Sequence, residues 1–125
     1  MHHEIKSINL AERLASFDET WVPKIVGELN DQYVKVVKFV GEYVWHQHDE
    51  QDELFLVLHG SMKLELEDKS IELTAGELVI VPRQVRHRPV ADELCEVLLF
   101  EPVSTRNTGD VDHPYTIEPD DLEAI

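Results

Sequence analysis

Residues 41–60 read G-E-Y-V-W-H-Q-H-D-E-Q-D-E-L-F-L-V-L-H-G, and this stretch indicates both the fold and the chemistry of the chain. It contains two histidines one residue apart, His46 and His48, and an acidic run that ends at Glu53. Because residues two apart in a strand point to the same side, the two imidazoles can reach one point in space. The apolar run that follows Glu53 predicts a buried strand.

A second stretch, residues 76–87, reads G-E-L-V-I-V-P-R-Q-V-R-H and ends on a third histidine. If Glu53 points into the same interior as the histidines, the chain brings together three imidazoles and one carboxylate. Such a ligand set suits iron, manganese, nickel, copper or zinc, and residue types alone do not choose among these metals. Four protein ligands leave one or two coordination positions open for a substrate or dioxygen. The sequence therefore predicts a divalent metal site formed by His46, His48, Glu53 and His87.

The composition indicates one small acidic domain. The chain has 125 residues, of which 42% are hydrophobic, enough for a single core. Its formal net charge of -15 predicts that neither nucleic acid nor an anionic membrane is a partner, because both repel a negative surface. No apolar run approaches the roughly 20 residues that span a bilayer, and the N-terminus lacks the pattern of a signal peptide. The single cysteine, Cys95, allows no intrachain disulfide, so we expect a cytoplasmic protein.

The order of the predicted elements favours an all-β fold after one short helix. Asn9 is placed to cap a helix over residues 9–17, with Glu12 at the position that a capping box requires. From residue 21 onward β-favouring residue types dominate, without alternation of strands and helices. Seven or eight short strands predict a sandwich or barrel. The strands are expected at residues 22–29, 33–45, 54–58, 62–67, 70–74, 78–81, 86–90 and 96–100.

The composition changes again after Pro102, where the sequence becomes polar and loop-like. Residues 118–125 are expected either to form a short helical turn or to stay disordered. The predicted organisation is an N-terminal helical segment at residues 1–20 that packs on the barrel, a β-barrel at 21–102 and a C-terminal extension at 103–125. The sequence does not show whether His2 and His3 belong to the natural chain.

The two stretches resemble the paired motifs of the cupin superfamily. In the first, His46-x-His48, Glu53 and Gly60 stand at the family's spacing, while Gly41 comes one residue too close to the histidines. Asp52 would be the ligand if the gap after His48 were three residues, which the family also permits. Glu53 is preferred because the family position is a glutamate and its gap to Gly60 fits.

In the second motif, Gly76, Pro82 and His87 match the family pattern. Gln84 replaces a glycine and Ala91 replaces an asparagine, so the departures affect turn geometry and not the four ligand positions. The resemblance implies a cupin jelly-roll β-barrel, commonly dimeric. The tail E-P-V-S-T-R-N-T-G-D also looks like the end of small single-domain cupins labelled as similar to mannose-6-phosphate isomerase. That label is weak evidence for isomerase activity.

Other ionisable residues near the motifs have a plainer interpretation. Asp49 and Glu50 are expected in a solvated turn. His59 would lie roughly 20 Å along the strand from Glu53, too far to share a metal. His113 falls in the loop-like tail. The arginines around His87 are interpreted as surface salt-bridge partners and not as an anion site: Arg83, Arg86 and Arg88.

Alternation also predicts which side chains face the barrel interior. An apolar interior set is expected, with Glu42 as the only candidate general base: Val44, Phe55, Val57, Leu98 and Phe100. A second set is expected to face outward: Tyr43, Trp45, Leu54, Leu56 and Leu58. Large apolar side chains on an outer face need a cover, and we expect a partner subunit to supply it in a homodimer.

Two functions are compatible with this pattern. The first is a metalloenzyme that oxygenates or isomerises a small organic molecule at an open coordination position. The second is a non-catalytic module that binds a metal or a small ligand, for example as a sensor. A closed structural metal site is disfavoured, because such sites fill all their coordination positions with protein ligands. The sequence identifies neither the substrate nor the native metal.

Overall fold

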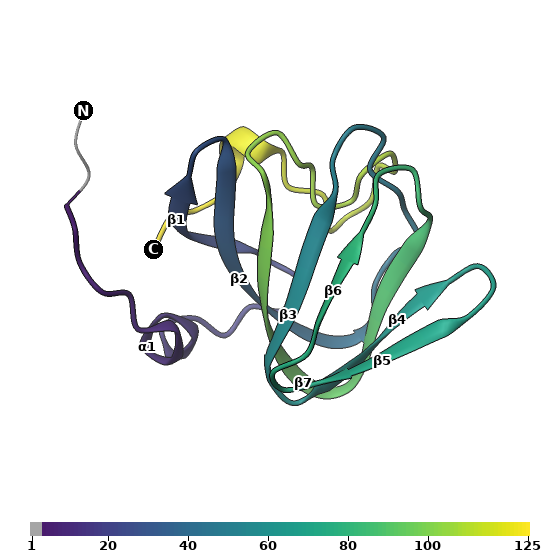
Figure 1. Cartoon of the computed structure of the whole chain (residues 1–125), viewed down its shortest axis with the longest axis horizontal. Helices are drawn as coiled ribbons and strands as arrows, with labels where there is room; N and C mark the ends of the chain where they lie inside the picture. Colours follow the sequence, from purple (N-terminus) through teal and green to yellow (C-terminus); the bar gives the residue numbers. More distant parts are fainter. Residues whose placement is uncertain (1–3) are drawn as a thin grey trace.

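The structure, a computed structural model, describes residues 4–125, so His2 and His3 lie outside the described part. Within that range the chain forms one short α-helix, seven β-strands and one 3-10 turn (Figure 1). None of the described helices is long and apolar enough to cross a membrane. The elements are α1 (Leu10–Ala15), β1 (Lys24–Leu29), β2 (Gln32–Glu42), β3 (Glu53–His59), β4 (Ser61–Leu66), β5 (Ser70–Thr74), β6 (Leu78–Val81), β7 (His87–Pro102) and the turn η1 (Pro119–Asp121).

All named strands pair antiparallel, in the order β1-β2-β7-β3-β6, and β4 pairs with both β5 and β7. Strand β7 is the element that curls the sheet into a barrel. Its first residues pair with β4, and its later part lies between β2 and β3. The predicted strands at 86–90 and 96–100 are therefore one strand. The two segments are continuous in the sheet because Ala91 and Cys95 both pair with β2, opposite Gly41 and Phe39.

The N-terminal helix forms as the capping pattern predicts. The Asn9 side chain accepts a hydrogen bond from the backbone N–H of Glu12 at 3.0 Å. The helix ends at Ala15, before the predicted residue 17, and Ser16 caps it. Leu14 and Phe17 pack on Val36, which faces outward from β2. This short helix is thus held by packing on the barrel, as a helix of so few residues requires.

The barrel interior contains an aromatic cluster, in which the ring of Trp21 stacks on Phe39 and Tyr43. Burial alternates along β3 as predicted: the even-numbered leucines are half-buried on the outer face and their neighbours are buried. The prediction is wrong for Leu98 and Phe100, which lie half-buried on the outer face of β7. The inward side of β7 carries the alternate residues: Cys95, Val97, Leu99 and Glu101.

The prediction that Tyr43 faces outward is also wrong. Gly41 has a φ of +87°, and the pairing register of β2 with β7 shifts between Phe39 and Gly41. The shift leaves the alternation of β2 unchanged, because Phe39 and Tyr43, four residues apart, both belong to the core. The inward parity changes only after β2 ends, between Tyr43 and His46. Tyr43 is therefore buried, with its ring centroid 4.8 Å from that of Trp21. Trp45 does lie at the surface, half-buried, under the guanidinium groups of Arg86 and Arg88.

The C-terminal segment is ordered along the barrel, which contradicts the expectation of a disordered end and agrees with that of a short turn. The turn η1 forms, and the backbone N–H of Ile25 donates to the carbonyl of Glu123 at 2.9 Å. Ile125 returns a hydrogen bond to Ile25, so the last residues add to the free edge of β1 (Figure 1). The division into segments at 20 and 102 stays a prediction.

Candidate metal centre

The two sequence motifs meet through a backbone bridge. The N–H of His46 donates to the carbonyl of His87 at 3.0 Å, and the N–H of His87 donates to His46 at 2.8 Å. This pairing places the two imidazoles side by side, with ring centroids 4.4 Å apart. His48 follows two residues later on the same side, and Glu53 is the first residue of β3. Each side chain is thus positioned by a paired or neighbouring strand.

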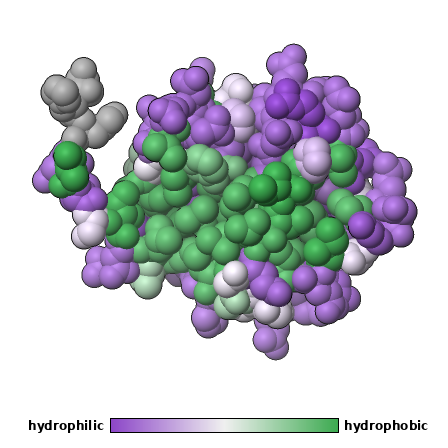
Figure 2. Space-filling model, viewed as in Figure 1, coloured by the Kyte–Doolittle hydropathy of each residue, from purple (hydrophilic) through white to green (hydrophobic). Residues whose placement is uncertain are grey.

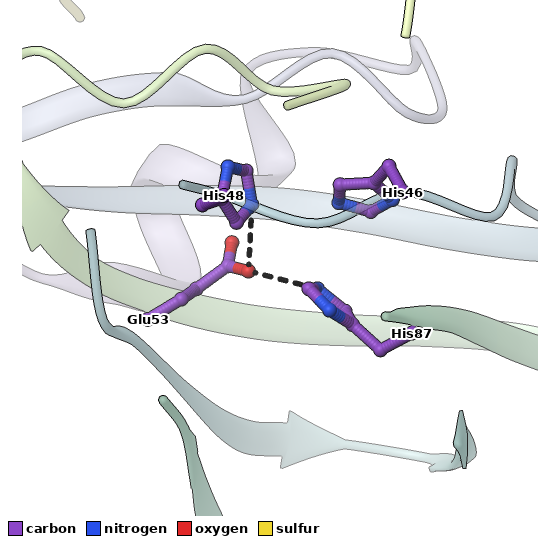
Figure 3. Close-up of side chains that lie close together, drawn as sticks. All are labelled: His46, His48, Glu53 and His87. Atoms are coloured by element: carbon purple, nitrogen blue, oxygen red, sulfur yellow. Dashed lines mark hydrogen bonds and ion pairs between the residues drawn. The ribbon is translucent and has the colours of Figure 1, made fainter. Parts of the chain in front are cut away.

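The structure brings all four predicted ligands together (Figure 3). One potential ligand atom from each of His46, His48, Glu53 and His87 lies within 4.8 Å of the others, and all four residues are buried. The Glu53 Oε1 atom lies 3.2 Å from His48 Nε2 and 3.3 Å from His87 Nε2. The cluster contains the donor types that divalent transition metals prefer.

Two of the imidazoles are oriented by backbone carbonyls. His46 Nδ1 lies 2.9 Å from the carbonyl of Val44, and His87 Nδ1 lies 2.8 Å from that of Val85. A carbonyl only accepts hydrogen bonds, so Nδ1 carries the proton in both rings. The Nε2 lone pairs therefore face the interior of the cluster. In metal sites the same arrangement fixes the ring tautomer and orientation.

The neighbours of Glu53 show that the cluster fits a cation. With its proton on Nδ1, neutral His87 presents an Nε2 lone pair to a carboxylate oxygen, and that contact becomes favourable only with a proton or a metal ion between them. His48 has both ring nitrogens buried without a hydrogen-bond partner among residues 4–125, since its 3.2 Å contact with Glu53 lacks hydrogen-bond alignment. A divalent ion between the Nε2 atoms and the Glu53 carboxylate would give His48 Nε2 a partner and make the contact of His87 with Glu53 favourable.

The electrostatics of the cluster agree with this fit. Burial, with a smaller effect of His87, lowers the pKa of His46 to about 4, so this ring is neutral at physiological pH. Burial alone would lower the pKa of His48 and of His87, but the Glu53 carboxylate raises both. Burial would raise the pKa of Glu53, and the two histidines hold it well below its ordinary value instead. The site thus contains an ionised carboxylate that attracts positive charge.

Comparison with known proteins identifies the family. Residues 37–101, half of the chain, match the family described as "Cupin domain". The chain is a cupin. It is 39% identical to a cupin-2 domain containing protein from Shewanella frigidimarina, whose crystal structure superposes with a TM-score of 0.75 over 76% of this chain and 93% of that one. Protein NMB1881 from Neisseria meningitidis is 33% identical, with a TM-score of 0.72 over 78% of this chain and 99% of that one.

Another relative of this cupin is a Bacillus subtilis protein named "Uncharacterized protein YdbB". The two are 39% identical over 64 residues, which is 50% of this chain. The match spans 57% of the Bacillus protein. These similarities support the fold and the family, and the names of the relatives assign no reaction.

The alternative ligands considered from the sequence lie apart from the cluster of this cupin. Asp52 is exposed and accepts a hydrogen bond from the backbone N–H of Arg83 at 2.9 Å. Glu50 is also exposed, and His59 is exposed at the end of β3. His113 contacts Tyr115 in the C-terminal segment. The choice of Glu53 over Asp52 is therefore supported by position and burial.

The prediction that Glu42, the candidate general base, faces the barrel interior is also wrong. Its carboxylate points to the surface, where it pairs with Arg88 at 2.7 Å. Glu42 follows the alternation of β2, in which Val36 also faces outward, and the inward parity changes only between Tyr43 and His46. Arg88 also pairs with Glu65 at 2.6 Å, and Arg83 pairs with Asp52 at 3.2 Å. The interpretation of these two arginines as surface salt-bridge partners is confirmed.

Sequence reasoning missed a buried ion pair beside the cluster. Lys35 Nζ donates to Glu101 Oε1 at 3.1 Å, and both side chains are almost completely buried. Glu101 borders a cavity of about 20 Å³ that His46 and Glu53 also line. The cavity can hold about one water molecule. Burial, with the charge of Glu53, raises the pKa of Glu101 to about 8. The only signal in the sequence was Glu101 itself, a charged residue that follows the apolar part of β7 at an inward-facing position.

Proposed function

We propose that this cupin binds one divalent transition metal through His46, His48, Glu53 and His87, and that it acts on a small organic molecule by oxygenation or isomerisation. One observation carries the proposal: His48 Nε2, buried without a hydrogen-bond partner among residues 4–125, faces an ionised buried carboxylate beside which His46 and His87 also lie. A positive ion at this point gives the unpaired Nε2 atom a partner and offsets the buried negative charge.

The protein's own contribution is orientation and exclusion of water. The carbonyls of Val44 and Val85 hold two rings with Nε2 toward the centre, and the aromatic wall of Trp21, Phe39 and Tyr43 keeps the adjoining cavity small. A metal bound there would supply Lewis acidity and an open position for an exogenous oxygen atom. The four protein ligands do not fill the coordination of a metal that takes five or six ligands.

A non-catalytic binding or sensor function is the alternative, and the size of the cavity favours it. A space of about 20 Å³ holds about one water molecule and no organic substrate without movement of its walls. Catalysis predicts a product, whereas binding alone predicts saturation without turnover. The two functions share the metal site and differ in whether the cavity opens.

The test of the metal site is elemental analysis of protein purified without a chelating column. We expect close to one equivalent of metal in the parent and little in a His48→Ala/His87→Ala double variant. His59→Ala is the matched control, because His59 is an exposed histidine on β3 outside the cluster. Iron in the parent would direct activity screens to oxygen consumption, and zinc or manganese to isomerisation or hydrolysis. A parent that takes up none of iron, manganese, nickel, copper or zinc would refute the proposal.

We also propose that this cupin is a homodimer and acts in the cytoplasm. Two rows of outward apolar side chains run across β7, β3 and β6: Phe100–Leu54–Ile80 and Leu98–Leu56–Leu78. Ile80 is 59% exposed and Leu78 is 54% exposed. Figure 2 shows apolar side chains gathered over this face of the molecule. Cys95 is a buried free thiol, which suits a reducing compartment.

A further inference from the structure

The Lys35–Glu101 pair occupies a position that packing alone does not explain. Lys35 lies on β2 and Glu101 on β7, and both point into the barrel, where the surrounding side chains are apolar or aromatic. Removing two charges from water is unfavourable, and an apolar pair of similar volume would pack there without that cost. A buried ion pair at such a position therefore suggests a function beyond folding.

The two oxygens of Glu101 have different environments. Oε1 accepts the hydrogen bond from Lys35 Nζ at 3.1 Å, which fixes the plane and direction of the carboxyl group. Oε2 is buried and has no hydrogen-bond partner in the described part of the chain. A buried carboxylate oxygen without a partner is costly, because it has lost its water and gained nothing in return. One side of Glu101 is thus held in place by a donor. The Glu53 carboxylate lies within hydrogen-bond reach of Glu101 but is an acceptor itself, so the other side still lacks a protein donor.

Glu101 and the metal cluster face the same cavity. Its lining includes His46 and Glu53 from the cluster together with Glu101, and the rest is largely aromatic and apolar. Glu101 is not one of the four residues whose ligand atoms lie within 4.8 Å of one another. It is placed to contact what binds the metal and not the metal itself.

We propose that Glu101, oriented by Lys35, is a ligand-positioning residue whose Oε2 atom hydrogen-bonds to a hydroxyl group held at the open side of the metal cluster. This inference rests on the proposed metal site. The preferred ligand is a small molecule that carries a hydroxyl group next to its metal-binding oxygen, because one oxygen can then bind the metal while the hydroxyl reaches Glu101. Such a ligand enters only when the walls of the cavity of about 20 Å³ move apart. A metal-bound water molecule presents the same O–H donor and is the second source that the experiment separates.

The experiment uses the full chain loaded with Co²⁺, whose visible absorption reports on its ligands. Glycolate and acetate serve as probes, since both carry a carboxylate and only glycolate carries a hydroxyl group. The ratio of their dissociation constants is measured for the parent and for Glu101→Met. We expect the preference for glycolate to fall about tenfold in the variant, the loss expected for one hydrogen bond to a charged group. Co²⁺ affinity should change much less than this ratio.

Two further variants separate positioning from folding. Val97→Ala removes a buried side chain from the same face of β7 that does not line the cavity, so it should lower stability and leave the glycolate preference unchanged. Glu101→Gln keeps the shape of the side chain and provides the comparison if Glu101→Met fails to fold. Its amide oxygen can still accept a hydrogen bond, so it should reduce the preference less than Glu101→Met does.

The outcomes distinguish this inference from the metal site on which it rests. If the parent does not bind Co²⁺, the proposed metal site itself fails. If the parent binds Co²⁺ and the glycolate preference falls in the Glu101 variants, the substrate hydroxyl is the partner. A changed Co²⁺ spectrum without either probe, with an unchanged preference, identifies metal-bound water as the partner. An unchanged spectrum together with an unchanged preference would overturn the inference and leave Lys35–Glu101 as a packing pair.

Discussion

At the scale of single residues, the four clustered side chains differ in how folding changes their affinity for protons. Burial and the neighbouring His87 lower the pKa of His46 to about 4, below the value of about 6.5 for an unfolded histidine. Between these two pH values the unfolded chain takes up a proton that the folded chain refuses, so metal-free protein loses stability as the pH falls from 6.5 to 4. His48 and His87 have raised pKa values, so the stability that they contribute is fully present below pH 6.5 and is lost as the pH rises above it.

The contribution of His46 can be measured by replacing it with an uncharged polar residue. In metal-free His46→Gln, we expect the loss of unfolding free energy between pH 6.5 and 4 to be smaller than in the parent, by up to about 3 kcal/mol. Urea unfolding at a series of pH values checks this difference. His59→Gln, at an exposed position, should follow the parent curve. Parallel curves for His46→Gln and the parent would show that His46 is protonated in the folded metal-free state.

At the scale of elements, the C-terminal segment holds the histidine strand in place. The backbone N–H of Asp110 donates to the carbonyl of Gln47 at 3.0 Å, and the Asp110 carboxylate accepts from the N–H of Gln47 at 3.1 Å. Gly109 precedes this contact with a φ of +56°, and a Cβ atom there would lie 2.1 Å from the Gln47 carbonyl oxygen. Only glycine therefore allows the segment to approach the residue between His46 and His48.

Substitution of Gly109 should disturb folding and metal binding together. We expect Gly109→Ala to lower the free energy of unfolding by more than about 2 kcal/mol and to weaken metal binding, because the clash must move the backbone between the two histidines. Gly76→Ala is the matched control. Gly76 also has a positive φ, +88°, but no atom lies within 4 Å of its Cβ position, so only about 1 kcal/mol of backbone strain is expected. Equal effects of the two substitutions, measured by chemical unfolding and Co²⁺ titration, would contradict this role for Gly109.

The elements also show which parts of the site could be predicted from the sequence. The group of His46, His48 and Glu53 depends on strand alternation and a short turn, and these local rules are visible in the spacing. The side to which Tyr43 points follows the alternation of β2, and this alternation breaks before His46, where the chain has left the strand. A break outside a regular strand is not visible in the spacing of residues. The inward face of β7 was ambiguous because residues of both parities are apolar between 95 and 100.

The buried ion pair could not be predicted for a different reason. Lys35 and Glu101 are 66 residues apart in the chain. Lys35 interrupts an apolar strand and Glu101 follows one, and neither residue belongs to a recognisable motif. Their contact results from the register of β2 against β7, in which Tyr33 lies opposite Glu101 and Lys35 opposite Leu99. A register of this kind is set by the whole barrel. Spacing along the chain carries no information about it.

At the scale of the whole molecule, a strongly acidic protein exposes an apolar face. The formal net charge is -15, which makes copies of the chain repel one another at long range. The rows ending at Leu78 and Ile80 provide short-range attraction that can exceed this repulsion if two copies bury the face together. Strand β6 pairs only with β3 among the described strands, so its outer edge is also free to meet a partner.

These opposed forces make the oligomeric state sensitive to charge on β6. We expect the parent to be a dimer in light scattering at physiological salt, and the Leu78→Lys/Ile80→Lys variant to be a folded monomer, because four lysines would have to lose water in one dimer interface. Leu94→Lys is the control, since Leu94 is 43% exposed on β7 outside the two rows. Added salt should strengthen the parent dimer by screening the repulsion between two acidic subunits. A parent that stays monomeric at high concentration and high salt would show that the apolar face of β3, β6 and β7 is not a contact between two copies.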